Sequence, residues 1–452
     1  MLITGIAHGW TGDASGTRLA GAIRIENGLI AEIGDLGPRP GEEVLDATGC
    51  VVTPGLVNTH HHLFQSVLKG IAIDFALDDW LARVPYFYWP RLDEETLRIS
   101  ARIGLAELAL TGATTVCDHH YVFSERYDYD PAEVLFEEAA RFGIRFVLAR
   151  GGMATGRDFG GEVPPPPVES VADFLDGIAS VAARWHDPSP HALTRVACAP
   201  TTPNFNFAPD ALPEIAQEAR RQGLRLHAHL SENTAYAAQT LRAFGQRPVP
   251  WLADCGWLGD DVWFAHLVDI TADEIALLAD TSTAMAHCPQ ANARLGSGIA
   301  PAPAMHLAGG TVSLAVDGAG ANEAADMGAA LYTAFALHRA AGGVDATAPR
   351  TVLHWATMGG AKALGLTGIG CLRVGMAADI AIFDLSAPRN FGLHDPALAP
   401  IITGAATVRH SLVGGRIVVR DGRLPHLDLA ELAEDASRVT ARLATRKEAV
   451  PA

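Results

Sequence analysis

Three stretches of the chain carry side chains that could bind a metal ion. Three consecutive histidines at 60–62 follow the apolar run PGLVNT. Because side chains alternate along a strand, His60 and His62 share one face and the histidine between them takes the other. The segment HAHLSE at 227–232 offers two further histidines, and AVDG at 315–318 offers a carboxylate. A catalytic ion of the zinc type takes about three protein ligands and keeps one position open for water, so these stretches suffice for a metal centre.

The two histidines of HAHLSE differ in how far they lie from the C-terminal end of the strand, and this decides which of them is the better candidate ligand. His227 lies deeper, which favours a role in packing behind the site, so we expect His229 to bind the metal. Asp317 supplies the carboxylate, and Glu232, three residues beyond His229, would stand near the metal-bound water. One histidine at a strand end is more often structural, but ligand-type residues at several strand ends together favour a metal site. The predicted ligands are His60, His62, His229 and Asp317.

The elements that would position these residues are eight apolar segments separated by helix-like stretches. Fully buried parallel strands read as near-continuous apolar runs, and these segments do. The predicted strands span residues 55–60, 113–119, 144–150, 194–200, 224–230, 262–268, 283–289 and 311–317. Polar side chains interrupt them at their C-terminal ends, His119 and His266 among them. The pattern predicts an α/β fold, a (β/α)8 barrel of the TIM type, which places its chemistry at those ends.

The two ends of the chain have a different pattern, with short apolar pieces broken by Gly, Asn and Asp. This alternation is typical of small antiparallel strands and hairpins. We therefore predict one β-sandwich domain built from both ends, residues 1–54 and 365–425, around a barrel of residues 55–364. Apolar residues at helical spacing then predict a C-terminal helix within residues 426–452, packed on the body of the protein.

The composition excludes several classes of partner. The 452 residues include 34 basic and 51 acidic side chains, for a formal charge of −17. A surface this acidic repels nucleic-acid backbones and anionic membranes, so we expect neither as a partner. There is no run of eighteen apolar residues and no signal-peptide pattern, and the six cysteines are scattered, as in a cytoplasmic protein with reduced thiols. The apolar helices are compatible with a homodimer.

Six motifs carry a resemblance that covers nearly the whole chain: PGLVNTHHH, HLSE, FAH, HCPQANARLGSGIAP, VDGAGANE and GMAADIAIFD. Together they resemble the amidohydrolase superfamily, most closely its branch of cytosolic deaminases and s-triazine hydrolases. The resemblance implies the same four metal ligands. It also implies that Glu232 is the acid/base, that Asp317 accepts a proton from the attacking water, and that His266 contacts the substrate or its oxyanion. Members with two metal ions bridge them with a lysine on strand four, which TRVACAP lacks. We expect one divalent ion, zinc first and iron as the alternative.

The resemblance is strongest to the isoxanthopterin and 8-oxoguanine deaminases of that branch. Thr201, in the turn APTTP, stands where guanine deaminases have an arginine. We therefore predict hydrolytic deamination of a 2-amino-4-oxo fused heterocycle, a pterin such as isoxanthopterin first and 8-oxoguanine second, with water as the other reactant. Two alternatives stay open: an amino- or chlorohydrolase of s-triazines, and an amidohydrolase-like binding protein without activity.

The predicted contacts with this substrate come from four places in the chain. Gln65 resembles a glutamine with which guanine-type deaminases read the pyrimidine edge of their substrate. Arg150, at the end of the third strand, could face a substrate carbonyl or form a salt bridge instead. Trp89 belongs to an aromatic loop whose side chains could stack on a flat ring or pack the loop onto the barrel. The predicted substrate contacts are Gln65, Arg150, His266 and Trp89.

Overall fold

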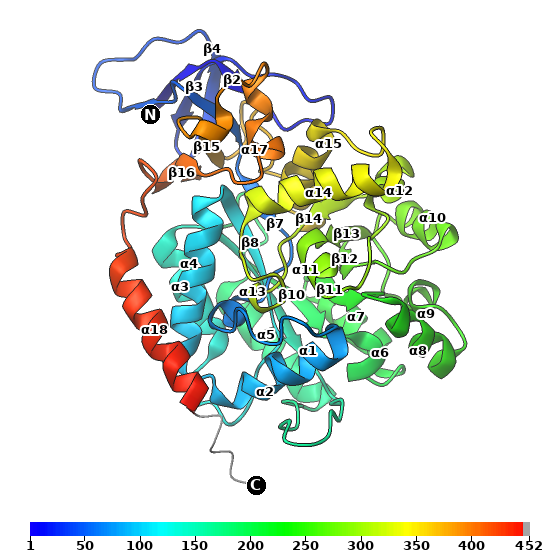
Figure 1. Ribbon diagram of the computed structural model, residues 1–452. Helices are drawn as coiled ribbons and strands as arrows, with labels where there is room; N and C mark the ends of the chain where they lie inside the picture. Colours follow the sequence, from blue (N-terminus) through cyan, green and yellow to red (C-terminus); the bar gives the residue numbers. More distant parts are fainter. Residues whose placement is uncertain (446–452) are drawn as a thin grey trace.

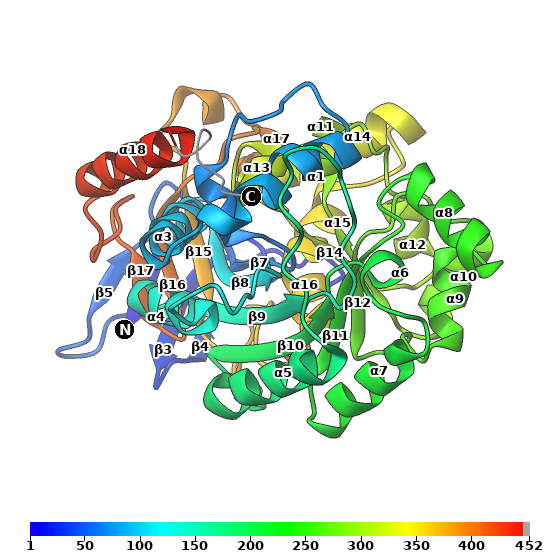
Figure 2. The same cartoon turned by 90° about the horizontal axis from the view of Figure 1, so that it is seen from below.

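Eight parallel strands form the centre of the molecule (Figure 2). The computed structural model describes residues 1–445 of the chain. The strands lie side by side in chain order: β7 (Leu56–Asn58), β8 (Ala113–His120), β9 (Arg145–Gly152), β10 (Thr194–Pro200), β11 (Arg225–Leu230), β12 (Val262–His266), β13 (Ala284–His287) and β14 (Val312–Leu314). The last strand meets the first, because the Ser313 Oγ lies 2.8 Å from the Thr59 Oγ1. The amide of Asp317 also donates to the carbonyl of His60 at 3.1 Å. The predicted TIM-type barrel is confirmed.

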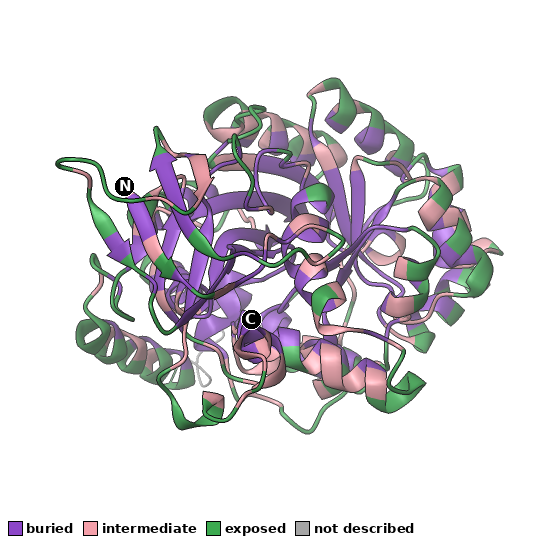
Figure 3. Ribbon diagram, turned by 90° about the horizontal axis from the view of Figure 1, so that it is seen from above, coloured by how far each residue is buried: buried purple, intermediate pink, exposed green. Residues whose placement is uncertain are grey.

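Long helices cover the outside of the barrel (Figure 1), and their outward faces are exposed whereas the barrel strands are buried (Figure 3). They are α3 (Glu94–Leu110), α4 (Pro131–Phe142), α5 (Val171–Trp185), α7 (Ala211–Arg221), α8 (Thr234–Phe244), α10 (Ala272–Asp280) and α14 (Met327–Gly342). Asp93 caps α3, since its Oδ1 accepts a hydrogen bond from the amide of Thr96 at 3.0 Å. The chain leaves that helix through Gly112, whose φ of 99° favours glycine.

Short helices occupy the connections between strands and helices. Several of them follow a barrel strand at its C-terminal end, where the loops of this fold form binding sites. They are η1 (Leu63–Val67), α1 (Leu77–Arg83), α2 (Pro85–Tyr88), η2 (Trp89–Arg91), α6 (Pro203–Asn206), α9 (Pro248–Asp254), α11 (Pro289–Arg294), α12 (Ala302–Leu307), α13 (Ala319–Asn322), α15 (Pro349–His354), η3 (Trp355–Gly359), α16 (Gly360–Ala363), η4 (Pro388–Asn390), η5 (Pro396–Leu398) and α17 (Ala399–Ile402).

Two further sheets lie at one end of the barrel and use strands from both ends of the chain (Figure 1). The first, in the order β4-β3-β1-β5, contains β1 (Leu2–Ile6), β3 (Gly21–Glu26), β4 (Leu29–Gly34) and β5 (Val44–Asp46). The second, in the order β17-β16-β15-β6-β2, contains β2 (His8–Gly9), β6 (Cys50–Pro54), β15 (Ile380–Asp384), β16 (Val408–Val413) and β17 (Arg416–Val419). Side chains of both sheets share one apolar core, in which Ile23 and Ile382 are fully buried. The predicted domain boundaries, after residues 54 and 364, stay predictions.

The helix α18 (Leu429–Thr445) packs against α3 on the outside of the barrel (Figure 1). Its apolar stripe is buried, and Arg442 donates hydrogen bonds to the carboxylates of Asp93 and Glu95, each at 2.8 Å. This is the helix that the sequence predicted within residues 426–452. Residues 446–452 of that range lie outside the described part of the chain.

None of the helices within residues 1–445 is long and apolar enough to cross a lipid bilayer. All six cysteines belong to the described part of the chain, and none of them forms a disulfide. Five of the six are buried, and only Cys371 is partly accessible. The five buried thiols therefore pack as small apolar core residues.

A buried ion pair joins the barrel to the two-sheet region. Arg145, at the start of β9, donates through Nε and Nη2 to both carboxylate oxygens of Asp379, each at 3.0 Å. Both residues are at most 2% exposed, and the amide of Gly414 also donates to Asp379. The variant Asp379→Ala leaves a buried guanidinium without its counter-charge, so we expect a loss of about 3–5 kcal/mol of unfolding free energy. Urea denaturation followed by circular dichroism measures this loss.

The control for this variant is an exposed ion pair that links the two ends of the chain. Arg420 and Glu43 lie 2.8 Å apart, with side chains 47% and 53% exposed. Because solvent screens such a pair, Glu43→Gln should change the unfolding free energy by less than about 0.5 kcal/mol. Equal losses in the two variants would contradict the assignment of a special role to the buried pair.

Candidate active site

A cavity opens at the C-terminal ends of the barrel strands, where the sequence predicted the chemistry. Titratable groups from the strand ends line it together with aromatic side chains from α1, α2 and α6. The lining includes His62, His229, His266, Asp317, Trp80 and Tyr86. A few convergent polar groups between apolar walls are the usual composition of a site for a small molecule.

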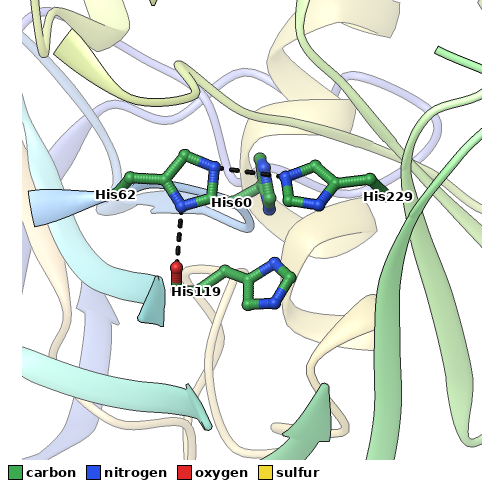
Figure 4. Close-up of side chains that lie close together, drawn as sticks. All are labelled: His60, His62, His119 and His229. Atoms are coloured by element: carbon green, nitrogen blue, oxygen red, sulfur yellow. Dashed lines mark hydrogen bonds between the residues drawn. The ribbon is translucent and has the colours of Figure 1, made fainter. Parts of the chain in front are cut away.

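Three imidazoles converge at this cavity (Figure 4), and one carboxylate joins them. Nε2 of His62 lies 3.2 Å from Nε2 of His229. Oδ1 of Asp317 lies 3.5 Å from Nε2 of His60 and 3.3 Å from Nε2 of His62. The structure therefore brings all four predicted ligands together, from the ends of β7, β11 and β14.

The outer nitrogens of two of these rings are occupied by backbone carbonyls. Nδ1 of His62 donates to the carbonyl of His119 at 2.7 Å, and Nδ1 of His229 donates to the carbonyl of Thr201 at 2.6 Å. In a neutral imidazole, a proton on Nδ1 leaves a lone pair on Nε2. The two Nε2 lone pairs thus face each other and repel, unless a proton or a cation lies between them.

The third ring, His60, is oriented by a chain of hydrogen bonds behind it. Nδ1 of His227 donates to the carbonyl of Trp263 at 2.9 Å, so its Nε2 accepts a hydrogen bond from Nδ1 of His60 at 2.8 Å. Nε2 of His60 is buried and makes no hydrogen bond. Its lone pair points to the same centre, and His227 takes the supporting place that the sequence predicted for it.

The protonation states of the cluster suit a cation. Burial lowers the pKa of His60 and His229 well below the ordinary value, so both rings are neutral. For His62, burial acts to lower the pKa, but the contact with Asp317 outweighs burial and raises it. For Asp317, burial acts to raise the pKa of the carboxyl, but its contacts with His60 and His62 outweigh this and hold the pKa well below its usual range. Imidazole nitrogens with one carboxylate form a donor set that fits zinc or iron, so the residues present fit the ion that the resemblance implies.

A fourth imidazole, His119 from the end of β8, lies against this cluster (Figure 4). Its Nε2 donates to the carbonyl of Ala199 at 3.1 Å, its Nδ1 is buried without a partner, and its ring stacks on His229 at 4.8 Å between centroids. The predicted ligand set did not include His119. Its position at the C-terminal end of a predicted strand was the signal that could have drawn attention to it.

Glu232 and His266 face each other in the same cavity. Oε1 of Glu232 lies 3.8 Å from Nε2 of His266, and both side chains are buried. Burial raises the pKa of the Glu232 carboxyl above its ordinary value. The amide of Asn292, which the sequence reasoning missed, lies 2.9 Å from Nδ1 of His266 and fixes the ring. Two carboxyls whose surroundings shift their pKa values in opposite directions therefore share one site, an arrangement typical of acid–base catalysis.

The backbone that carries these groups adopts an uncommon conformation. Ser231, His266 and Asp317 have φ values of 49°, 75° and 63°, in the left-handed region that favours glycine. Such positions cost free energy, persist only where the surrounding structure enforces them, and cluster at functional sites. Here they turn the chain at the ends of β11, β12 and β14, so that side chains beyond the regular strand enter the cavity.

Among the predicted substrate contacts, Gln65 lies in the cavity lining beside the metal-ligand cluster. Its Nε2 lies 3.4 Å from the hydroxyl of Tyr121, whereas its Oε1 is buried without a hydrogen-bond partner. A buried acceptor without a partner is costly, and a donor group on a bound molecule would satisfy it.

The structure places Arg150 and Trp89 away from the cavity lining. Arg150 donates to Glu169 at 2.8 Å and lies against α5, so the salt bridge that was its alternative interpretation is present. The indole of Trp89 is buried and donates to the carbonyl of Pro165 at 3.1 Å. Neither side chain is positioned to meet a substrate in this cavity, and we leave both out of the proposed substrate contacts.

The chain as a whole matches a known family. The sequence profile of the amidohydrolase family matches residues 51–418, which include the barrel and the strands that follow it. The chain belongs to the amidohydrolase family. The protein is thus an enzyme, a hydrolase that acts on C–N bonds, and the resemblance drawn from its motifs is confirmed.

Individual relatives of this amidohydrolase cover almost its full length. It is 46% identical over 440 residues to an isoxanthopterin deaminase from an unknown prokaryotic organism, covering 93% of this chain and 91% of the relative. It is 37% identical over 424 residues to an 8-oxoguanine deaminase from Pseudomonas aeruginosa, covering 93% and 94%. It resembles the crystal structure of an atrazine chlorohydrolase from Arthrobacter aurescens TC1 complexed with zinc, with a TM-score of 0.88 and 29% identity over 97% of this chain and 99% of that one.

The supporting role of His227 leads to a prediction for this amidohydrolase. Replacing His227 by Leu removes the acceptor that orients His60 and leaves its Nδ1–H buried without a partner. We expect the affinity for zinc to fall by about 10- to 100-fold, as is usual when a group behind a metal ligand is lost. Competition with a chromophoric chelator measures this affinity.

A second pair of buried histidines provides the matched control. Nε2 of His338 lies 2.9 Å from Nε2 of His287, and neither ring belongs to the cluster around His60. His338→Leu also removes one buried imidazole from a histidine pair, but it should leave the zinc affinity unchanged. Equal affinity losses in His227→Leu and His338→Leu would point to general destabilisation instead of ligand orientation.

Proposed function

We propose that the enzyme is a hydrolytic deaminase of a 2-amino-4-oxo fused heterocycle, a pterin such as isoxanthopterin first. The observation that carries this proposal is the pairing of carboxyls in one cavity: Glu232, whose pKa burial raises, and Asp317, which stays ionised beside the imidazole cluster. Removal of an amino group from an aromatic ring needs both a proton donor for the ring and a proton acceptor for water. The 46% identity to an isoxanthopterin deaminase supports the choice of ring.

The site would hold one divalent ion, and zinc is the first choice, with iron as the alternative. Its ligands would be His60, His62, His229 and Asp317. A bound divalent ion lowers the pKa of water to about 7 and so supplies a nucleophile at neutral pH. The converging Nε2 lone pairs support this assignment.

The side chains would then divide the proton transfers between them. Glu232, protonated, donates to the ring nitrogen next to the amine-bearing carbon, which makes that carbon electrophilic. Asp317, ionised, accepts the proton of the attacking water and passes it to the amino group, which leaves as ammonia. The proton that remains on the added oxygen returns to Glu232 as the product carbonyl forms. Nε2 of His266, which is buried without a hydrogen-bond partner, would hydrogen-bond the oxygen that adds to the ring. Gln65 can accept a hydrogen bond from the pyrimidine edge through its unsatisfied Oε1.

The second candidate substrate is 8-oxoguanine, which has the same 2-amino-4-oxo pattern on a smaller bicycle. The 37% identity to an 8-oxoguanine deaminase supports it. An s-triazine stays a third candidate, since the structural likeness to an atrazine chlorohydrolase extends over most of both chains. The free and mostly buried cysteines support our further proposal that the enzyme acts in the cytoplasm.

The test is ammonia release by the zinc-loaded enzyme from isoxanthopterin, pterin, 8-oxoguanine, guanine, cytosine and an aminated s-triazine. We expect the highest kcat/KM with isoxanthopterin, by at least about tenfold over the other rings. A preference for 8-oxoguanine would agree with the proposed mechanism but would replace the pterin by 8-oxoguanine as the substrate. Ammonia from none of these compounds would overturn the proposed function.

A further inference from the structure

A single cationic side chain reaches the cavity that holds Glu232 and Gln65. Among the described residues that line this cavity, Arg157 is the one arginine or lysine. It lies in the connection after β9, seven residues beyond the position at which the sequence predicted a substrate-binding arginine. Its guanidinium lies over the rings of Phe205 and Phe159, at 4.6 and 5.0 Å from their centroids. The two aromatic faces hold the cation at the wall of the cavity.

The protein provides this arginine with only a weak partner. Nη2 of Arg157 donates to Oδ1 of Asp78 at 3.0 Å, and the Asp78 side chain is 61% exposed. An ion pair this open to water contributes little, so a ligand can compete for the guanidinium. Arg150 differs, since its side chain is 5% exposed and both of its terminal nitrogens bind Glu169. Of these two arginines, Arg157 is the one whose donors remain available to a molecule in the cavity.

We propose that Arg157 binds the oxo group on the second ring of the substrate and so selects oxidised bicycles over their unoxidised parents. This inference rests on the proposed deaminase function and names the feature of the substrate that the site reads. With the amine-bearing edge held at Glu232 and Gln65, the second ring of a fused heterocycle extends along the cavity, away from the ligand cluster. Trp80 and Tyr86 line the same cavity and can pack against its flat faces.

The chemistry of such a ring matches a guanidinium. An oxo group beside a ring N–H draws electron density onto its oxygen, and loss of that proton spreads a negative charge over oxygen and nitrogen. The planar fork of arginine donates to two neighbouring acceptors at once, which a lysine ammonium or a neutral amide does less well. Both leading candidates carry this group on the second ring, so the inference does not depend on which of them is the better substrate.

The test uses two pairs of compounds that differ only in the oxo group: isoxanthopterin with pterin, and 8-oxoguanine with guanine. For Arg157→Gln we expect KM for the oxo member to rise by about 10- to 100-fold, with kcat changed by less than about threefold. KM for the parent compound should stay within about threefold, so the preference within the pair collapses. Arg157→Lys should fall between the wild type and Arg157→Gln, since it keeps the charge and loses the fork.

A matched control and a binding measurement separate the possible failures. Arg83 ends α1 and lies over the ring of Phe75 at 4.2 Å, but it does not line the cavity, so Arg83→Gln should change neither pair. Quenching of tryptophan fluorescence gives Kd for all four compounds without turnover. If the wild type binds the oxo compounds more tightly than their parents and Arg157→Gln loses this preference, the role of Arg157 is supported. This holds even if no ammonia forms, because the absence of ammonia would overturn only the proposed deaminase function. Equal effects of Arg157→Gln on both members of a pair, or no preference in the wild type, would overturn the inference.

Discussion

Replacing Glu232 by Gln is expected to lower kcat for deamination by about 10²- to 10⁴-fold, which is the usual contribution of a general acid to the rate. The amide has nearly the shape of the carboxyl but cannot give up a proton to the ring nitrogen. Glu232 lies 3.8 Å from His266 and is not among the groups of side chains that could hold an ion. The zinc content of the variant should therefore equal that of the wild type.

Two measurements decide this prediction. Steady-state kinetics with the best substrate of the panel gives kcat, and atomic absorption gives the zinc content of the same preparation. Turnover of Glu232→Gln at the native rate would rule out the acid/base role. A loss of zinc together with activity would instead place Glu232 at the ion.

The variant His229→Ala should lose both the ion and the activity. It removes one of the two Nε2 atoms that lie 3.2 Å apart and leaves Nε2 of His62 facing an empty space. Since loss of a supporting group costs about 10- to 100-fold in metal affinity, loss of a direct ligand should cost at least about 100-fold. Zinc content after dialysis and ammonia release measure the two effects.

The comparison with His227→Leu makes this result specific. His227 and His229 lie on the same strand, two residues apart, but only the second would bind the ion directly. We expect a partial loss of zinc in the first variant and a nearly complete one in the second. Retention of both zinc and activity in His229→Ala would mean that the ligand within HAHLSE has been wrongly chosen, with His119 as the neighbouring ring to test next.

The barrel could be predicted from the sequence because its strands are buried on both faces and therefore read as apolar runs. The ends of those strands were less accurate. The first predicted strand ran to residue 60 and the last to residue 317, but β7 ends at Asn58 and β14 at Leu314. The residues beyond them leave the regular strand, as the φ of 63° at Asp317 shows. No apolar pattern announces such a turn, since the tertiary structure imposes it.

The ligand cluster was predictable for a related reason, whereas the contact of Arg150 was not. Alternation along one strand places His60 and His62 on the same face without any knowledge of neighbouring strands. For Arg150, the register between β8 and β9 determines whether its side chain points into the barrel or outward. It pairs with His120, while Ala149 pairs with His119, whose ring lies in the cluster. Side chains of paired residues share a face, so Arg150 points outward, and a single sequence does not contain this register.

The five-stranded sheet has a consequence for how the protein is made. Its strand β6 lies between β2, its neighbour from the N-terminal segment, and β15, which follows the whole barrel in the chain. During synthesis, β6 emerges early and keeps an unpaired edge until the ribosome has completed the barrel. Contacts between distant parts of a chain form slowly, and open strand edges invite aggregation in the meantime. Forms of this enzyme that are truncated before β15 or translated slowly should therefore need chaperones to avoid aggregation, although the complete chain folds into a compact molecule.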